Sequence, residues 1–161
     1  MLNLPNANDA ILECGCGTEY ILPYLIQMKK NTCKLFLTDI SRVKLRVVAK
    51  KCETIENTPL SRHIYDYNYI PTNEEVKEAK EPYFNKFLNV FVERADACNL
   101  PYESSIFDIY FGGMLLQEVN NPFSAIKEAF RVLKKGGRAG FTIPDSMGAD
   151  NEFDLILAQA V

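Results

Sequence analysis

Short apolar runs rich in branched and aromatic residues alternate along this chain with segments of helical period. We predict five of these runs to be strands, at residues 10–13, 34–38, 89–94, 106–111 and 138–143. Strands that alternate with helices are typical of a parallel sheet joined by crossover helices. The pattern therefore predicts an α/β fold.

Apolar side chains spaced three and four residues apart predict the first two helices. The expected inner face of the first helix is Ile21, Leu22, Leu25 and Ile26. Ser41 is expected to cap the second helix, since a serine side chain can accept hydrogen bonds from the first free N–H groups. The side chains of this helix predicted to face inward are Val43, Val47 and Val48.

Two further helices are predicted in the second half of the chain. One is capped by Asn121, begins at Pro122 and ends at the residues 134–137. Its expected inner stripe is Phe123, Ile126, Phe130 and Leu133. The other begins at about Asp150, because Phe153, Ile156, Leu157 and Ala160 have helical spacing.

The stretch of residues 53–88 is longer than ordinary connections between elements. We expect it to contain a mostly solvated helix over residues 73–81, closed by Pro82. Tyr65, Tyr67 and Tyr69 alternate as in an extended segment, and they either pack this insertion onto the sheet or form an aromatic lid or partner surface. We predict a single domain over residues 1–161 with an insertion at about 53–88.

Composition and charge argue against nucleic-acid binding, a metal site and a membrane span. The chain of 161 residues has a net charge of −3, so no overall basic field favours nucleic acid. Its five cysteines are odd in number and contain no C-x-x-C, which favours reduced thiols over disulfides or a metal site. No apolar run reaches the roughly 18 residues of a membrane span, and no basic leader starts the chain, so we expect a cytoplasmic protein.

Candidate chemistry lies where the first two strands end. Gly15 and Gly17 follow the first strand, where they leave no side chain between an anionic group and the exposed N–H groups of the next helix. Asp39 ends the second strand and suits ribose hydroxyls. Tyr20 replaces the third glycine of the dinucleotide fingerprint, and no phosphate-binding G-x-x-x-x-G-K-[ST] is present. These features indicate an adenosine-containing cofactor other than NAD or FAD.

Five motifs in order carry a family resemblance: ECGCGT at 13–18, DIS at 39–41, DACNLPY at 96–102, FDIY at 107–110 and RVLKKGG at 131–137. The chain resembles class I S-adenosylmethionine-dependent methyltransferases, most closely the ubiquinone-biosynthesis-like (type 11) group. The resemblance implies a Rossmann-like three-layer sandwich with strand order 3-2-1-4-5. It also implies S-adenosylmethionine as cofactor and S-adenosylhomocysteine as product, with a small molecule or a protein as methyl acceptor.

The same resemblance implies roles for individual residues. Glu13 would hold the ammonium of the cofactor, and Gly15 and Gly17 its methionine and ribose portion. Asp39, with Ile40 beside it, would hold the ribose diol, and Asp96 and Ala97 would meet the adenine. Gly112 and Met114 would approach the sulfonium. The alternative is that Asp39 and Asp96 only cap turns.

Other positions depart from the family. Glu19 stands where relatives often have a third glycine. We expect the chain to lack two parts of the family fold, the helix before the first strand and the final strands. Their absence would leave the fifth strand as an open edge for a partner protein. These departures keep two alternatives open: a catalytically inactive binding or assembly subunit, and a fragment of a longer enzyme.

Catalytic residues are not indicated, because methyl transfer mainly needs an acceptor held in line with the donor. Where a proton must leave the acceptor, the candidate bases by position are Gln117, Glu118 and Asp145. His63 is the only histidine, but its place in the insertion favours a surface or packing role. Residues 112–115 replace the motif used to methylate amines of nucleic acid bases, so that reaction is not expected.

Overall fold

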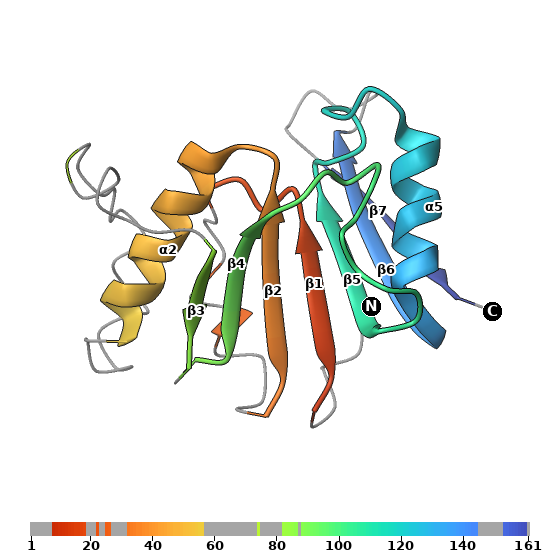
Figure 1. The fold of residues 1–161 in the computed structure, drawn as a ribbon. Helices are drawn as coiled ribbons and strands as arrows, with labels where there is room; N and C mark the ends of the chain where they lie inside the picture. The colour runs from red at the N-terminus through yellow and green to blue at the C-terminus, as the bar shows by residue number, and fades with distance from the viewer. Residues whose placement is uncertain are drawn as a thin grey trace.

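The computed structural model describes residues 8–18, 22, 25–26, 32–56, 74, 82–86, 88–144 and 153–160. Within these residues the strands form one seven-stranded sheet in the order β3-β4-β2-β1-β5-β6-β7 (Figure 1). Their bounds are β1 Ala10–Cys14, β2 Lys34–Asp39, β3 Tyr83–Asn85, β4 Val90–Arg94, β5 Phe107–Gly113, β6 Leu133–Pro144 and β7 Phe153–Gln159.

The five predicted strands are β1, β2, β4, β5 and β6, and their predicted order is confirmed. Each pairs in parallel with its neighbour in the order β4-β2-β1-β5-β6. Their carboxyl ends meet along one edge, the upper one in Figure 1. Antiparallel strands border this parallel sheet, β3 beside β4 and β7 beside β6.

The helix predicted from about Asp150 is wrong, because residues 153–159 form β7. A short apolar run fits helical and strand periods about equally, so local pattern alone could not decide between them. The edge of β6 decides, since it offers a full ladder of unpaired backbone groups that β7 fills from Arg138 to Pro144. The expected open edge of the fifth strand is therefore paired, and the argument for a partner protein at that edge is lost.

Helix α2 spans Arg42–Glu56 and begins as predicted beside Ser41, whose Oγ accepts a hydrogen bond from the backbone N–H of Lys44 at 3.4 Å. The prediction that Val43 faces inward is wrong, because its side chain is 64% exposed. The buried face is instead Leu45, Val48, Ala49 and Cys52. The helix also continues through residues that we assigned to the start of the insertion.

Helix α5 spans Pro122–Val132, and its predicted cap is confirmed: the Oδ1 of Asn121 accepts from the N–H of Ser124 at 3.1 Å. The inward placement of Phe123 is wrong, because this side chain is 84% exposed. The buried residues of the helix are Ala125, Ala129 and Val132. Small side chains there let the helix lie close to the sheet, and Leu133 is already the first residue of β6.

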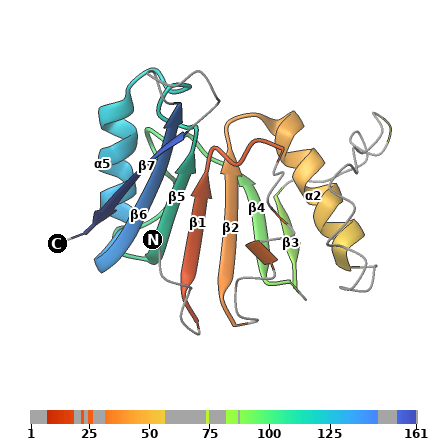
Figure 2. The same cartoon turned by 180° about the vertical axis from the view of Figure 1, so that it is seen from behind.

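Two apolar clusters cover opposite faces of the sheet, since neighbours along a strand point to opposite sides. Ile11 belongs to the cluster with Leu45 and Val48 of α2, whereas Leu12 belongs to the cluster with Ala129 of α5. Helix α2 packs against β2, β3 and β4, and α5 packs against β6 (Figures 1 and 2). The helices therefore form the outer layers of the predicted sandwich.

Part of the insertion lies outside the described residues, including Tyr65, Tyr67, Tyr69 and almost all of the helix predicted over 73–81. Glu74 is described there and is helical. Strand β3, which we did not predict, pairs antiparallel with β4 and lies at the edge of the sheet. Among the described residues, no helix is long and apolar enough to cross a membrane.

Candidate functional site

A pocket of about 430 Å³ opens at the carboxyl ends of β1, β2, β4 and β5. This is the switch point where parallel α/β sheets bind ligands, and the volume falls in the usual range for small-molecule sites. The predicted site residues that line it are Gly15, Asp39, Ile40, Asp96, Ala97 and Met114. The remaining predicted residues, Glu13, Gly17 and Gly112, are outside the lining.

The turn after β1 is fixed to the end of β2. The N–H groups of Gly15 and Cys16 both donate to the carbonyl oxygen of Thr38, at 2.8 and 2.9 Å. Gly15 has a φ of +74°, and a Cβ there would lie 2.7 Å from Cδ1 of Leu115. The left-handed backbone conformation therefore favours glycine, and a larger residue would also displace the side chain of Leu115.

Asp39 is a buried carboxylate with a fixed orientation. Its Oδ2 accepts from the N–H of Gly17 at 2.9 Å, and its Oδ1 accepts from the N–H of Ser41 at 2.8 Å. Gly17, with a φ of +61°, is outside the lining and orients the Asp39 carboxylate through this hydrogen bond. Each carboxylate oxygen keeps acceptor capacity for a further donor. Asp39 is both a turn cap and a pocket residue.

Asp96, after the neighbouring strand β4, has the same double character. Its Oδ1 accepts from the N–H of Cys98 at 2.8 Å, whereas its Oδ2 accepts no hydrogen bond within the described part of the chain. The preceding residue, Ala95, donates its N–H to the carbonyl oxygen of Asp39 at 3.2 Å. The two aspartates predicted from separate motifs therefore meet in one pocket, although both also cap turns.

The loop after β5 brings Met114 to the pocket in a left-handed conformation, with a φ of +51°. Its N–H donates to both the carbonyl oxygen and the Oγ1 of Thr142 at 3.0 Å. Gly112, one of the predicted cofactor residues, is buried, and a Cβ there would lie 2.9 Å from Cδ1 of Phe141. Close packing accounts for this glycine. Glu13 is also buried, within β1, and is not part of the lining.

Several lining residues were not among the predicted cofactor-binding residues: Cys14, Lys44, Ala95, Cys98, Leu115, Glu118, Val119, Asn120 and Asn121. Most of them directly follow the ends of β4 and β5, so their position along the chain was the available signal. Glu118 was one of the candidate bases, and Gln117 is outside the lining. Glu19, His63 and Asp145 lie outside the described residues.

Cys14 is a potential nucleophile in the lining. Burial raises the pKa of its thiol, and the carboxylates of Asp39 and Asp96 act in the same direction. The thiol therefore stays protonated at neutral pH. Because the thiolate is the reactive form, Cys14 is a weak nucleophile in this pocket.

A family model described as a methyltransferase domain matches residues 59–141, just over half of the chain. A ubiquinone/menaquinone biosynthesis C-methyltransferase of Ruegeria sp. (strain TM1040) is 44% identical over 43 residues, which cover 27% of this chain and 17% of that protein. A malonyl-[acyl-carrier protein] O-methyltransferase of Marinomonas sp. (strain MWYL1) is 25% identical over 137 residues, or 85% of this chain and 38% of that protein.

Among solved structures, a SAM-dependent methyltransferase from Aquifex aeolicus superposes with a TM-score of 0.68 at 17% identity, covering 93% of this chain and 63% of that one. At this identity the likeness shows the fold, which is the predicted Rossmann-like α/β sandwich. The chain spans less than two thirds of the length of each of these relatives. By the match of the family model over more than half of its residues, the chain belongs to the methyltransferase domain family, whose members depend on S-adenosylmethionine.

Proposed function

We propose that this protein transfers the methyl group of S-adenosylmethionine to a small-molecule or protein acceptor. The observation that carries the proposal is the meeting of Asp39 and Asp96 with the Gly15 turn in one pocket at the switch point of the sheet. These residues come from three different strand ends. Their convergence suits a ligand with one polar ribose, one planar base and one charged tail.

The chemistry of the lining fits an adenosyl group. Asp39 would accept from the ribose hydroxyls, because its oxygens are already oriented by Gly17 and Ser41. Asp96 would accept from an exocyclic amine through Oδ2. Ile40 and Ala97 supply apolar surface in the same lining, against which a flat base could be buried.

S-adenosylmethionine, when bound, supplies an electrophilic methyl group on a sulfonium. The contribution of the protein is to bind, orient and shield. The backbone of Met114, fixed by Thr142, and the side chain of Leu115 limit the pocket on the β5 side. Glu118 is the described candidate base in the lining, for an acceptor that must lose a proton.

The acceptor is proposed only as a class. One relative is named for carbon methylation in ubiquinone and menaquinone biosynthesis, and the other for oxygen methylation of a malonyl group on an acyl carrier protein. Both a small molecule and a group carried on a protein therefore fit the family. Glu118 and Asn120 line the pocket and are exposed, so the part of the pocket that they form is next to solvent. Either acceptor could approach there.

Calorimetry with S-adenosylhomocysteine tests the cofactor site. We expect saturable binding, and we expect Asp39→Asn to weaken it about tenfold to hundredfold, the scale of hydrogen bonds to a charged group. Asp108→Asn is the matched control, because Asp108 also accepts from a backbone N–H and contacts Lys134, at the opposite ends of β5 and β6. An absence of binding by the folded wild-type protein would contradict the proposal.

A transfer assay with labelled S-adenosylmethionine and fractionated cell extract tests the reaction. Labelled acceptor that depends on Asp39 supports methyl transfer. Binding of S-adenosylhomocysteine without any labelled acceptor would instead support the alternative of a catalytically inactive binding subunit.

A further inference from the structure

The loop of residues 95–106 joins β4 to β5 and contributes Asp96, Ala97 and Cys98 to the pocket. Apart from a single bridge between Asp96 and Asn99, it contains no regular secondary structure. Its backbone N–H and C=O groups must therefore find partners elsewhere in the molecule. The conformation of the pocket wall depends on those partners.

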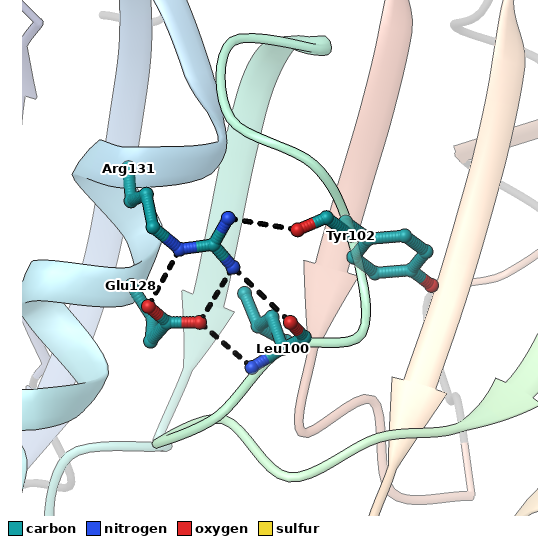
Figure 3. Close-up of polar contacts among 4 residues, drawn as sticks. All are labelled: Leu100, Tyr102, Glu128 and Arg131. Carbon is teal, nitrogen blue, oxygen red and sulfur yellow. Dashed lines mark hydrogen bonds and ion pairs between the residues drawn. The ribbon is translucent and has the colours of Figure 1, made fainter.

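One ion pair on α5, between Glu128 and Arg131, provides three of these hydrogen-bond partners. The guanidinium of Arg131 donates from Nη1 to the carbonyl oxygen of Tyr102 at 2.7 Å and from Nη2 to that of Leu100 at 3.1 Å. The Oε2 of Glu128 accepts from the N–H of Leu100 at 2.8 Å. Figure 3 shows both side chains reaching from α5 to the loop.

The two charged groups also hold each other in a bidentate pair. Nε of Arg131 lies 2.7 Å from Oε1 of Glu128, and Nη2 lies 2.7 Å from Oε2. The side chains are 32% and 15% exposed, so water competes only partly for these contacts. An arginine fork fits this arrangement because it donates in one plane to a carboxylate and two carbonyls at once, which a lysine ammonium cannot reproduce.

The pocket-lining part of the loop is thereby anchored on both sides. At its start, Ala95 donates to the carbonyl oxygen of Asp39. After it, the ion pair fixes Leu100, and the hydroxyl of Tyr102 donates to Oε1 of Glu93 at 2.6 Å. Neither Glu128 nor Arg131 lines the pocket.

We propose that Glu128 and Arg131 are positioning residues that hold the Asp96–Ala97 wall in the geometry that binds the adenine of the cofactor. This inference rests on the proposed function. Loss of the pair releases the loop on one side of the wall. The methionine side of the cofactor, on the Gly15 turn, keeps its contacts.

The experiment compares Arg131→Lys with Lys134→Met. Lys134 also forms an ion pair, with both carboxylate oxygens of Asp108 at 2.9 and 2.8 Å, but it does not touch the loop. We expect Arg131→Lys to weaken binding of S-adenosylhomocysteine by about tenfold, the scale of one lost charge-assisted contact. We expect the same loss for 5′-methylthioadenosine, which carries the adenine without the amino acid, and an unchanged dissociation constant for Lys134→Met.

Hydrogen exchange supplies a readout that general destabilisation would not produce. In Arg131→Lys the amide of Leu100 should exchange faster while the amides of β1 and β5 keep their protection. If Arg131→Lys does not fold, Glu128→Gln is used, since it keeps the size of the side chain and weakens the acceptor for Leu100.

Equal dissociation constants for wild type and Arg131→Lys would overturn the inference, as would an equal loss in Arg131→Lys and Lys134→Met. In both cases wild-type binding would leave the proposed function standing. Wild-type protein that binds neither ligand would overturn the proposed function and this inference together.

Discussion

At the residue scale, the site is built from groups that each do two things. Asp39 fixes the turns at Gly17 and Ser41 and still presents acceptor capacity to the pocket. Asp96 caps its own turn through one oxygen and leaves the other for a ligand. A carboxylate already held by backbone N–H groups loses little further freedom on binding, so such residues are well suited to recognise hydroxyl and amine donors.

Thiol labelling can report occupancy of this pocket. Cys98 is half-buried in its lining, whereas Cys14, Cys16, Cys33 and Cys52 are buried. We expect a maleimide to modify Cys98 first among these residues. S-adenosylhomocysteine at a concentration ten times its dissociation constant should slow the modification of Cys98 about tenfold, because only the ligand-free fraction reacts. Peptide mass spectrometry measures the rate, Cys98→Ser is the control, and an unchanged rate would place the ligand elsewhere.

At the scale of elements, α5 connects the pocket with the loop that forms one of its walls. Its capping residue, Asn121, lines the pocket, and its last turns carry Glu128 and Arg131. The helix then passes directly into β6 at Leu133. Because β6 pairs with β5, the helix is linked through β6 to the strand that precedes Met114.

The contact between β5 and β6 gives a prediction about Gly112. We expect Gly112→Ala to lower the free energy of unfolding by about 1–3 kcal/mol, the usual cost of overpacking, because the new Cβ would lie 2.9 Å from Phe141. Affinity for S-adenosylhomocysteine should change little, since Gly112 is outside the lining. Urea unfolding and calorimetry measure the two quantities.

The double variant Gly112→Ala with Phe141→Leu is the control for that prediction, because it removes the ring from the new methyl group. It should recover part of the lost stability relative to the sum of the single changes. A large loss of affinity in Gly112→Ala without loss of stability would instead return this glycine to the cofactor site.

At the scale of the whole molecule, the sheet is closed off at both sides by antiparallel strands and covered by helices on opposite faces. The ion pair of Glu128 and Arg131 links the covering helix to the loop between β4 and β5. Hydrogen bonding to Arg131 lowers the pKa of Glu128, with the N–H of Leu100 acting in the same direction. Acid should therefore weaken the fold at this contact.

The sign follows from proton linkage. With its folded pKa lowered, Glu128 binds fewer protons in the folded than in the unfolded state. Its contribution to stability is present above the unfolded value of about 4.3 and is lost as pH falls through the folded pKa. We expect urea midpoints of wild type to fall more steeply below about pH 4.3 than those of Glu128→Gln. Parallel curves for the two proteins would contradict this assignment.

The sequence by itself determined the order of the parallel strands, the caps at Ser41 and Asn121, and the residues Gly15, Asp39, Asp96 and Met114 of the pocket. The caps, Gly15 and Asp39 follow from local rules, since strand ends, turns and caps are set by neighbouring residues. The strand order, Asp96 and Met114 came with the family resemblance. About two thirds of the predicted cofactor residues line the pocket.

Only the tertiary structure decided the rest. Residues 153–159 became a strand because the edge of β6 offered a ladder, and Val43 and Phe123 turned outward because the sheet meets other faces of their helices. The N–H of Gly17 donates to the carboxylate of Asp39, and Gly112 leaves room for the ring of Phe141. Arg131 reaches carbonyls 29 and 31 residues away. Such contacts join segments far apart in the chain, and no local period contains them.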